Sequence, residues 1–176
     1  MSKKFIIWTD ASSKEIVNYD IVTVVGFVLK DDKYPCLHGS SIHYKINNSK
    51  GEIKAGIESL SILTEYCDCF GYDVEECEVE MKTDFPDLKN IINHKMVSSK
   101  NTEKLELLKE LKAIRERFKS VKCDEIDRTT NIAHNVCHWG MEAFRENGNH
   151  TNGPVENFYE IYENPKLCKE KESTQN

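Results

Sequence analysis

Residues 5–13 read FIIWTDASS, and the fold is built around this stretch. Its first five residues form a continuous apolar run, which is typical of a central strand buried on both faces of a sheet. The run ends at Asp10, and small residues follow it. We therefore expect a central strand that places a carboxylate at one end of the sheet.

Two more strands and a helix are expected next. Residues 21–29 are rich in β-branched side chains, residues 31–33 offer a turn, and a further extended stretch covers residues 37–46. These features predict three antiparallel strands. From Gly51 the pattern takes the period of a helix. The expected buried stripe of this helix consists of Ile53, Ile57, Leu60 and Thr64.

The second half of the chain alternates strands with helices. Residues 78–84 show the two-residue period of a strand that ends at Asp84, and Pro86 then starts a short helix. Thr102 is expected to cap a helix of about 17 residues. A strand over residues 121–127 and a last helix from Asn131 complete the pattern. The buried side of that last helix is expected to carry Ile132, Val136, Trp139 and Ala143.

This order of elements predicts an α/β fold with a mixed five-stranded sheet, in which three antiparallel strands are followed by parallel strands, flanked by helices. The helix from Gly51 connects the third strand to the fourth. Because such crossovers are right-handed, the first and fourth strands lie side by side and parallel. Asp10 and Asp84 then meet at neighbouring strand ends.

Two acids at the ends of adjacent parallel strands repel each other and lose hydration, unless a cation lies between them. Glu52 lies in the first turn of the connecting helix, on the flank that also carries Ala55, Gly56 and Ser59, and leans over the same strand ends. Hard oxygen ligands suit Mg²⁺ or Mn²⁺. Enzymes that displace a group from phosphorus commonly use a pair of such ions about 3.5–4 Å apart.

Length and composition limit the class of protein. The 176 residues predict one domain over 1–146, followed by a polar tail over 147–176 that packs loosely or is disordered. The net charge of −6 excludes binding of nucleic acid by bulk charge alone. No apolar stretch is long enough for a membrane span, and the seven cysteines lack a paired framework. We expect a cytoplasmic, monomeric protein that does not bind membranes.

Four short motifs follow one another on the predicted elements. Residues 8–12 (WTDAS) resemble a first-strand motif that ends in Asp-Gly/Ala-Ser, and residues 51–60 (GEIKAGIESL) resemble a helix written Ala-Glu-Leu-x-Ala. Residues 82–85 (KTDF) resemble a fourth-strand Thr/Ser-Asp-Ser motif, with Phe85 in place of the serine. Residues 128–134 (RTTNIAH) resemble a closing Arg-x-x-Asn-x-x-Ala-Asp motif. In order and spacing, these motifs are similar to those of the ribonuclease H superfamily, type 1, and especially its compact, reverse-transcriptase-like branch.

This resemblance implies a metal-dependent endoribonuclease that cleaves the RNA strand of RNA/DNA hybrids. The catalytic and metal-binding residues that it implies, for two Mg²⁺ or Mn²⁺ ions, are Asp10, Glu52, Asp84 and His134. The substrate-binding residues that it implies are Ser12, Ser13 and Asn131, with the serines near the ribose 2′-hydroxyls that identify RNA.

Two departures from the family pattern keep a second interpretation open. His134 stands where the fourth carboxylate is normal, and imidazole is softer than carboxylate and carries no negative charge. The basic, tryptophan-bearing protrusion with which many members grip the hybrid has no clear counterpart. The alternative is therefore a catalytically weakened or inactive module that binds nucleic acid or a protein partner.

Two other groups of residues invite a metal interpretation. His138 follows His134 by one helical turn, and such a pair can bind a transition metal, but the remaining ligands are not apparent. Cys67, Cys69 and Cys77 lack the spacing of a structural zinc site. We interpret the histidines as surface or core residues and the cysteines as thiols.

Overall fold

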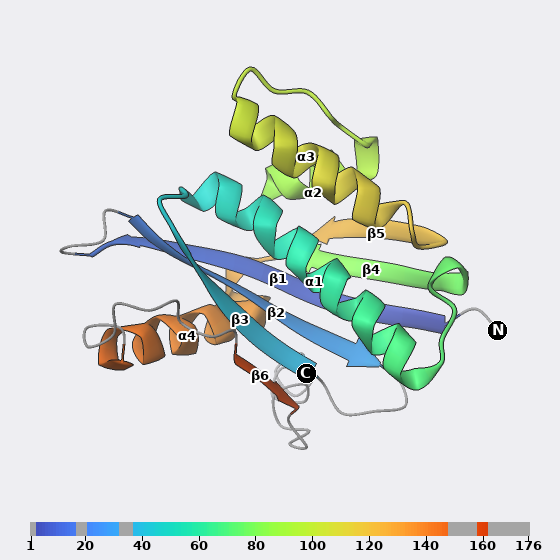
Figure 1. The fold of residues 1–176 in the computed structure, drawn as a ribbon, viewed down its shortest axis with the longest axis horizontal. Coiled ribbons are helices and arrows are strands. Elements are labelled where there is room, and N and C mark those ends of the chain that lie inside the picture. The colour runs from blue at the N-terminus through green and yellow to red at the C-terminus, as the bar shows by residue number, and fades with distance from the viewer. Residues whose placement is uncertain (1–2, 17–20, 32–36, 148–157, 162–176) are drawn as a thin grey trace.

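The computed structural model describes residues 3–16, 21–31, 37–147 and 158–161 (Figure 1). The strands are β1 (Lys3–Glu15), β2 (Ile21–Asp31), β3 (Leu37–Tyr44), β4 (Cys77–Thr83), β5 (Ser120–Glu125) and β6 (Phe158–Ile161). The α-helices are α1 (Asn48–Phe70), α2 (Pro86–His94), α3 (Thr102–Arg115) and α4 (Ala133–Asn147). Two 3₁₀ turns are η1 (Val74–Glu76) and η2 (Arg128–Thr130).

The strands form one sheet in the order β5-β4-β1-β2-β3-β6. β1, β2 and β3 are antiparallel neighbours, whereas β4 runs parallel to both β1 and β5. The expected five-stranded mixed sheet is therefore confirmed. β6 adds a sixth strand, antiparallel to β3, which the sequence pattern did not predict. Most of residues 147–176 lie outside the described residues, so the division into a domain and a polar tail stays a prediction.

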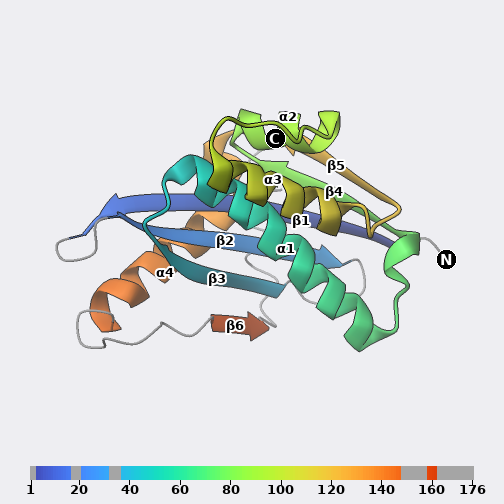
Figure 2. The same cartoon turned by 45° about the horizontal axis from the view of Figure 1, so that its top comes forward.

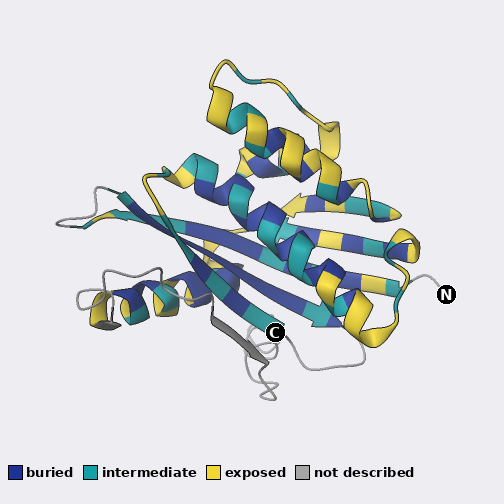
Figure 3. Cartoon of the chain, viewed as in Figure 1, coloured by how far each residue is buried: buried dark blue, intermediate teal, exposed yellow. Residues whose placement is uncertain are grey.

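Helices cover both faces of the sheet (Figures 1 and 2). Successive side chains of β1 point to opposite faces. Asp10 contacts His134 of α4, whereas a Cβ at Gly51 of α1 would lie 3.1 Å from Ala11 Cβ. α1 thus packs on one face and α4 on the other. Figure 3 shows that burial concentrates on the central strands between these two layers. No helix among the described residues is long and apolar enough to cross a membrane.

The main core lies under α1. Its largest fully buried side chains include Phe5, Ile7, Leu60, Leu63 and Met81, which come from β1, α1 and β4. The stripe predicted for α1 is buried along its whole length. Asn47 caps the helix by accepting a hydrogen bond from the Lys50 backbone N–H, and Gly71 ends it at φ 70°.

The structure corrects three details of the sequence analysis. β1 does not end at Asp10 but continues, paired with β2, to Glu15. The cap of α3 is Asn101 instead of Thr102, because the Asn101 side chain accepts from the Lys104 backbone N–H. α3 also ends at Arg115, so it spans 14 residues instead of about 17.

A further correction concerns α4, where Trp139 is 46% exposed instead of buried. The buried face of α4 consists of Ala133, Val136, Cys137, Met141 and Phe144. Gly140 brings this face close to the sheet, since a Cβ at Gly140 would lie 2.8 Å from Val24 Cγ1. The helix is therefore rotated so that Trp139 lies at the margin of the contact.

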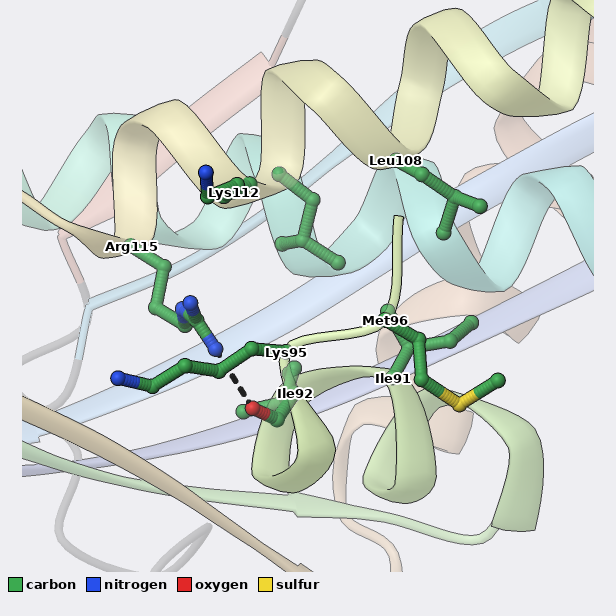
Figure 4. Close-up of a pocket in the computed structure, with 8 residues that line it drawn as sticks. Ile91, Ile92, Lys95, Met96, Leu108, Lys112 and Arg115 are labelled. Carbon is green, nitrogen blue, oxygen red and sulfur yellow. Dashed lines mark hydrogen bonds between the residues drawn. The ribbon is translucent and has the colours of Figure 1, made fainter. Parts of the chain in front are cut away.

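Arg115 of α3 bonds α2, and Asn93 of α2 bonds the outer strand β5. Arg115 is buried at the end of α3, and its Nη1 donates to the Ile92 carbonyl of α2 at 2.7 Å (Figure 4). Asn93 of α2 bonds both backbone groups of Cys123 on β5. Its Nδ2 donates to the Cys123 carbonyl at 2.7 Å, and its Oδ1 accepts from the Cys123 N–H at 2.9 Å.

Candidate active site

Asp10 and Asp84 occupy equivalent positions beyond the last paired residues of two parallel strands. The ladder between β1 and β4 ends at the pair Trp8 and Lys82, and each acid lies two residues further along. β1 has no β4 partner beyond this point, although it remains paired with β2. The two carboxylates therefore stand where the sheet opens, as the topology predicted.

Asn131, two residues before α4, and His134, in the first turn of α4, hold both acids. Asn131 is 2% exposed, and its Nδ2 donates to Asp84 Oδ1 at 2.7 Å and to the Thr9 carbonyl at 2.9 Å. Its Oδ1 accepts from the Ala133 backbone N–H. One amide thus links the ends of β1 and β4 to α4. His134 Nδ1 forms a hydrogen bond with Asp10 Oδ2 at 2.9 Å.

Glu52 approaches from α1 and is only 3% exposed. Asn48 Nδ2 donates a hydrogen bond to its Oε1 at 3.3 Å, and the Ala11 backbone N–H acts to lower the pKa of its carboxyl. Its Oε2 is buried and has no hydrogen-bond partner among the described residues. Gly51 permits this close approach, because a Cβ there would lie 2.6 Å from Thr23 Cγ2.

Burial and neighbouring negative charge change the pKa of two of the carboxylates, Glu52 and Asp10. Burial raises the pKa of Glu52 from 4.5 to about 9, and the negative charges of Asp10 and Asp84 add to the rise. Burial also raises the pKa of Asp10, and the Asp84 charge acts in the same direction, although the hydrogen bond with His134 opposes it. Asp10 and Glu52 therefore resist carrying negative charge together unless a cation joins them.

No lysine or arginine of the described residues forms an ion pair with Asp10, Glu52 or Asp84; the one ion-pair partner found is His134. Within the described ranges, no group of three His, Cys, Asp or Glu side chains has the arrangement of an assembled metal site. The chemistry of the donors nevertheless fits Mg²⁺ or Mn²⁺. These ions take carboxylate oxygens, and the buried Oε2 of Glu52 is an acceptor that still lacks a partner.

Two neighbours of the acids were missed by the sequence analysis. Cys137 is fully buried, burial raises the pKa of its thiol well above 9, and Sγ donates to the Asp10 carbonyl at 3.3 Å. Nothing in the sequence indicates this contact, because it depends on how α4 docks. Asn48, by contrast, precedes Glu52 by four residues, so the helical period contained a signal for it.

The predicted substrate-binding residues lie at different places. The side-chain amide of Asn131 forms hydrogen bonds within the protein, with Asp84, Thr9 and Ala133. Ser13 lies three residues after Asp10 on β1. Its Oγ is 2.6 Å from Oγ1 of Thr23 on β2. Ser12 is partly exposed. Contacts of these three residues with a substrate stay predictions.

An open groove adjoins Asp84 between β5 and η2. Its lining residues are Asp84, Lys89, Asp124, Glu125, Ile126, Asp127 and Arg128. Lys89 is paired with Glu125 at 3.0 Å. Arg128 forms no ion pair with any described residue, so its guanidinium is available to an anionic ligand beside Asp84.

Comparison with known proteins identifies the fold. No protein-family model matches this sequence, and no curated protein sequence matches it either. Among solved structures, the chain is similar to the ribonuclease H1 of the halophilic archaeon Halobacterium salinarum, with 16% identity, 80% of this chain and 98% of that chain covered, and a TM-score of 0.63.

Two structures of a compost-derived ribonuclease H1 are also similar to this chain. LC11-RNase H1, obtained by a metagenomic approach, has 23% identity, with 81% of this chain and 98% of that chain covered and a TM-score of 0.66. The same enzyme in complex with an RNA/DNA hybrid has 22% identity, coverage of 79% and 97%, and a TM-score of 0.65. The chain therefore has the fold of the ribonuclease H superfamily.

Proposed function

We propose that this protein is a divalent-metal-dependent endoribonuclease that hydrolyses the RNA strand of RNA/DNA hybrids. The observation that carries the proposal is that the charges of Asp10 and Asp84 act on the buried Glu52, while no lysine or arginine among the described residues pairs with any of these three acids. The fold adds support, because LC11-RNase H1 has a structure in complex with an RNA/DNA hybrid.

In this proposal, Asp10, Glu52, Asp84 and His134 would hold Mg²⁺ or Mn²⁺. When bound, such ions supply Lewis-acid stabilisation of the charge that develops on the phosphate. The protein's own residues keep the ligands in place: Asn131 fixes Asp84, and His134 fixes Asp10. Arg128 offers a positive charge to a neighbouring phosphate in the groove beside Asp84.

One observation favours a second candidate function, a module that binds nucleic acid or protein without turnover. His134 forms a hydrogen bond with Asp10 at the position where the resemblance expects a fourth acid. An imidazole adds no negative charge, so the site holds a second dication less tightly than four acids would. Binding of a hybrid without cleavage in either metal would favour this candidate.

The test is cleavage of an end-labelled RNA/DNA hybrid with Mg²⁺ or Mn²⁺ by the wild type and by Asp10→Asn. We expect the substitution to lower kcat by at least about 100-fold, because it removes a charge that acts in the transition state. Asp68→Asn is the matched control. Asp68 is exposed on α1, 16 residues after Glu52 and therefore about 24 Å away along the helix. Equal cleavage by wild type and Asp10→Asn contradicts the proposal.

A further inference from the structure

Arg115, at the end of α3, is a buried cation with an unused hydrogen-bond donor. The residue is only 6% exposed. Its Nη1 donates to the Ile92 carbonyl, whereas its buried Nη2 has no hydrogen-bond partner among the described residues. The one ion-pair partner found there is the carboxylate of Glu116, whose Oε1 is 3.9 Å from Nη2 and so too far away for a hydrogen bond. Because arginines are almost never this buried unless they are paired, we expect an anion to join this guanidinium.

Arg115 lines an open groove along the outer edge of β5. The groove lies between this strand and the C-terminal ends of α2 and α3. Its charged lining residues are Lys95, Arg115, Lys119 and Lys122, together with Glu116 and Asp124. Four positive charges against two make the groove cationic, although the net charge of the chain is −6. The groove therefore attracts anions locally.

Two of these lysines are available to a ligand. Lys95 and Lys122 are exposed and form no ion pair with any described residue, whereas Lys119 pairs with Glu78 at 2.8 Å. Lys95 lies near Arg115, and both also line the small hollow between α2 and α3 that Figure 4 shows. Guanidinium groups bind phosphate through their fixed fork of N–H donors, and lysines add point charges. Arg115, Lys95 and Lys122 thus offer the donors that a phosphate group needs.

We propose that this groove binds phosphate groups through Arg115, Lys95 and Lys122, and that these phosphates belong to a nucleic-acid strand that extends past the acids. The groove meets the one beside Asp84 at Asp124, which lines both. Lys122 precedes Asp124 by two residues, or about 7 Å along β5. This length is about two base-pair steps of a duplex, at about 3.4 Å each. A strand in the first groove therefore reaches the second within a few nucleotides.

The phosphate site stands apart from the proposed hydrolysis, because none of its three cations forms an ion pair with the acids of the candidate active site. Only the identity of its occupant, a nucleic-acid strand, rests on the proposed function. The alternative source of the same chemical group is free phosphate. The experiment therefore measures binding of both, and it does so without divalent metal, so that cleavage plays no part.

The first measurement is the affinity of a fluorescein-labelled RNA/DNA hybrid, by fluorescence anisotropy in EDTA over a range of NaCl concentrations. The second is the rise in Tm that inorganic phosphate causes at constant ionic strength. The proteins are the wild type, Lys95→Gly, Lys122→Ala, Arg115→Lys and the control Lys100→Ala.

The variants are chosen to separate binding from folding. Lys95 has φ 54°, a conformation that glycine adopts readily, so Lys95→Gly removes the charge without straining the backbone. Arg115→Lys keeps the charge and a donor for Ile92 but loses the guanidinium fork. Lys100 is exposed and precedes α3, whose 14 residues place it about 20 Å from Arg115. Lys100→Ala therefore removes the same charge outside the groove.

We expect Lys95→Gly and Lys122→Ala each to raise the Kd of the hybrid about 8-fold at about 0.1 M NaCl. The slope of log K against log [NaCl] should become shallower by about 1, the loss of one phosphate contact. The rise in Tm with phosphate should fall by at least about half in both variants and in Arg115→Lys. Lys100→Ala should match the wild type throughout.

The remaining outcomes separate the site from its occupant. An effect of Lys95→Gly and Lys122→Ala on phosphate alone would support the site and overturn its place on a nucleic-acid strand. Values for these variants that equal those of Lys100→Ala in both measurements would overturn the whole inference. Neither result depends on whether the wild type cleaves a hybrid, which is the test of the proposed function.

Discussion

Glu52 should make the stability of the metal-free protein depend on pH. Its pKa is about 9 in the folded protein and 4.5 as the reference for an exposed side chain. The folded state therefore keeps a proton that the unfolded state has lost. Because the unfolded state binds fewer protons, the free energy of unfolding falls as the pH rises from about 5 to about 9, and this loss is absent below pH 4.5.

The size of the effect follows from the linkage relation. One proton difference is worth about 1.4 kcal/mol per pH unit, so raising the pH from 6 to 8 should cost about 3 kcal/mol of stability through Glu52. For a chain of this length that corresponds to a decrease in Tm of about 6–12 °C. Glu52→Gln removes the titrating group but keeps its shape. The variant should therefore lose this part of the pH dependence.

The assay is chemical or thermal unfolding of the metal-free wild type and Glu52→Gln between pH 5 and pH 9. Saturating Mn²⁺ should restore the stability of the wild type at pH 8 and do little for the variant, because metal binding displaces the proton from Glu52. Parallel stability curves for the two proteins across this range would refute the idea that Glu52 is held protonated among the acids.

Three further outcomes are expected. Asn131→Ala should lower stability by about 1–3 kcal/mol, since it leaves buried groups at Asp84 without a partner, and should reduce cleavage 10- to 100-fold in the hybrid assay; full activity would contradict the positioning role. Gly51→Ala should destabilise the protein by about 1–3 kcal/mol in denaturant unfolding, because its methyl group meets Thr23; no change would show that α1 shifts freely. His134→Asp should increase the affinity for Mn²⁺ in calorimetry and reduce any preference for Mn²⁺ over Mg²⁺ in cleavage, because it restores a fourth negative charge; weaker Mn²⁺ binding would refute this view of His134.

The sequence was sufficient for the topology and for the placing of Asp10 and Asp84 at the neighbouring ends of β1 and β4. A buried apolar strand, a small-residue helix flank and the handedness of crossovers together leave few arrangements, and each places these acids at one end of the sheet. The spacing of apolar residues also located α1 and α2 well. These features depend on short-range pattern and chain connectivity.

The features that the sequence did not reveal depend on tertiary contacts. Trp139 fits an apolar stripe, yet Gly140 and Cys137 rotate α4 so that Trp139 lies outside the contact. The bonds from Asn131 to Asp84 and Thr9 join residues 47 and 122 positions apart, which no local pattern encodes. The strand β6 is too short for its period to be recognised and forms through pairing with β3.

The hydrogen bonds between Asn93 and Cys123 affect the tendency of the protein to self-associate through the edge of its sheet. β5 is an outer strand, and unsatisfied amide and carbonyl groups along such a strand are a template for intermolecular strand addition. Asn93 satisfies both groups of Cys123 with a side chain and leaves a foreign strand nothing to pair with there. A single carboxamide thus blocks the addition of a foreign strand at Cys123 on this margin of the sheet.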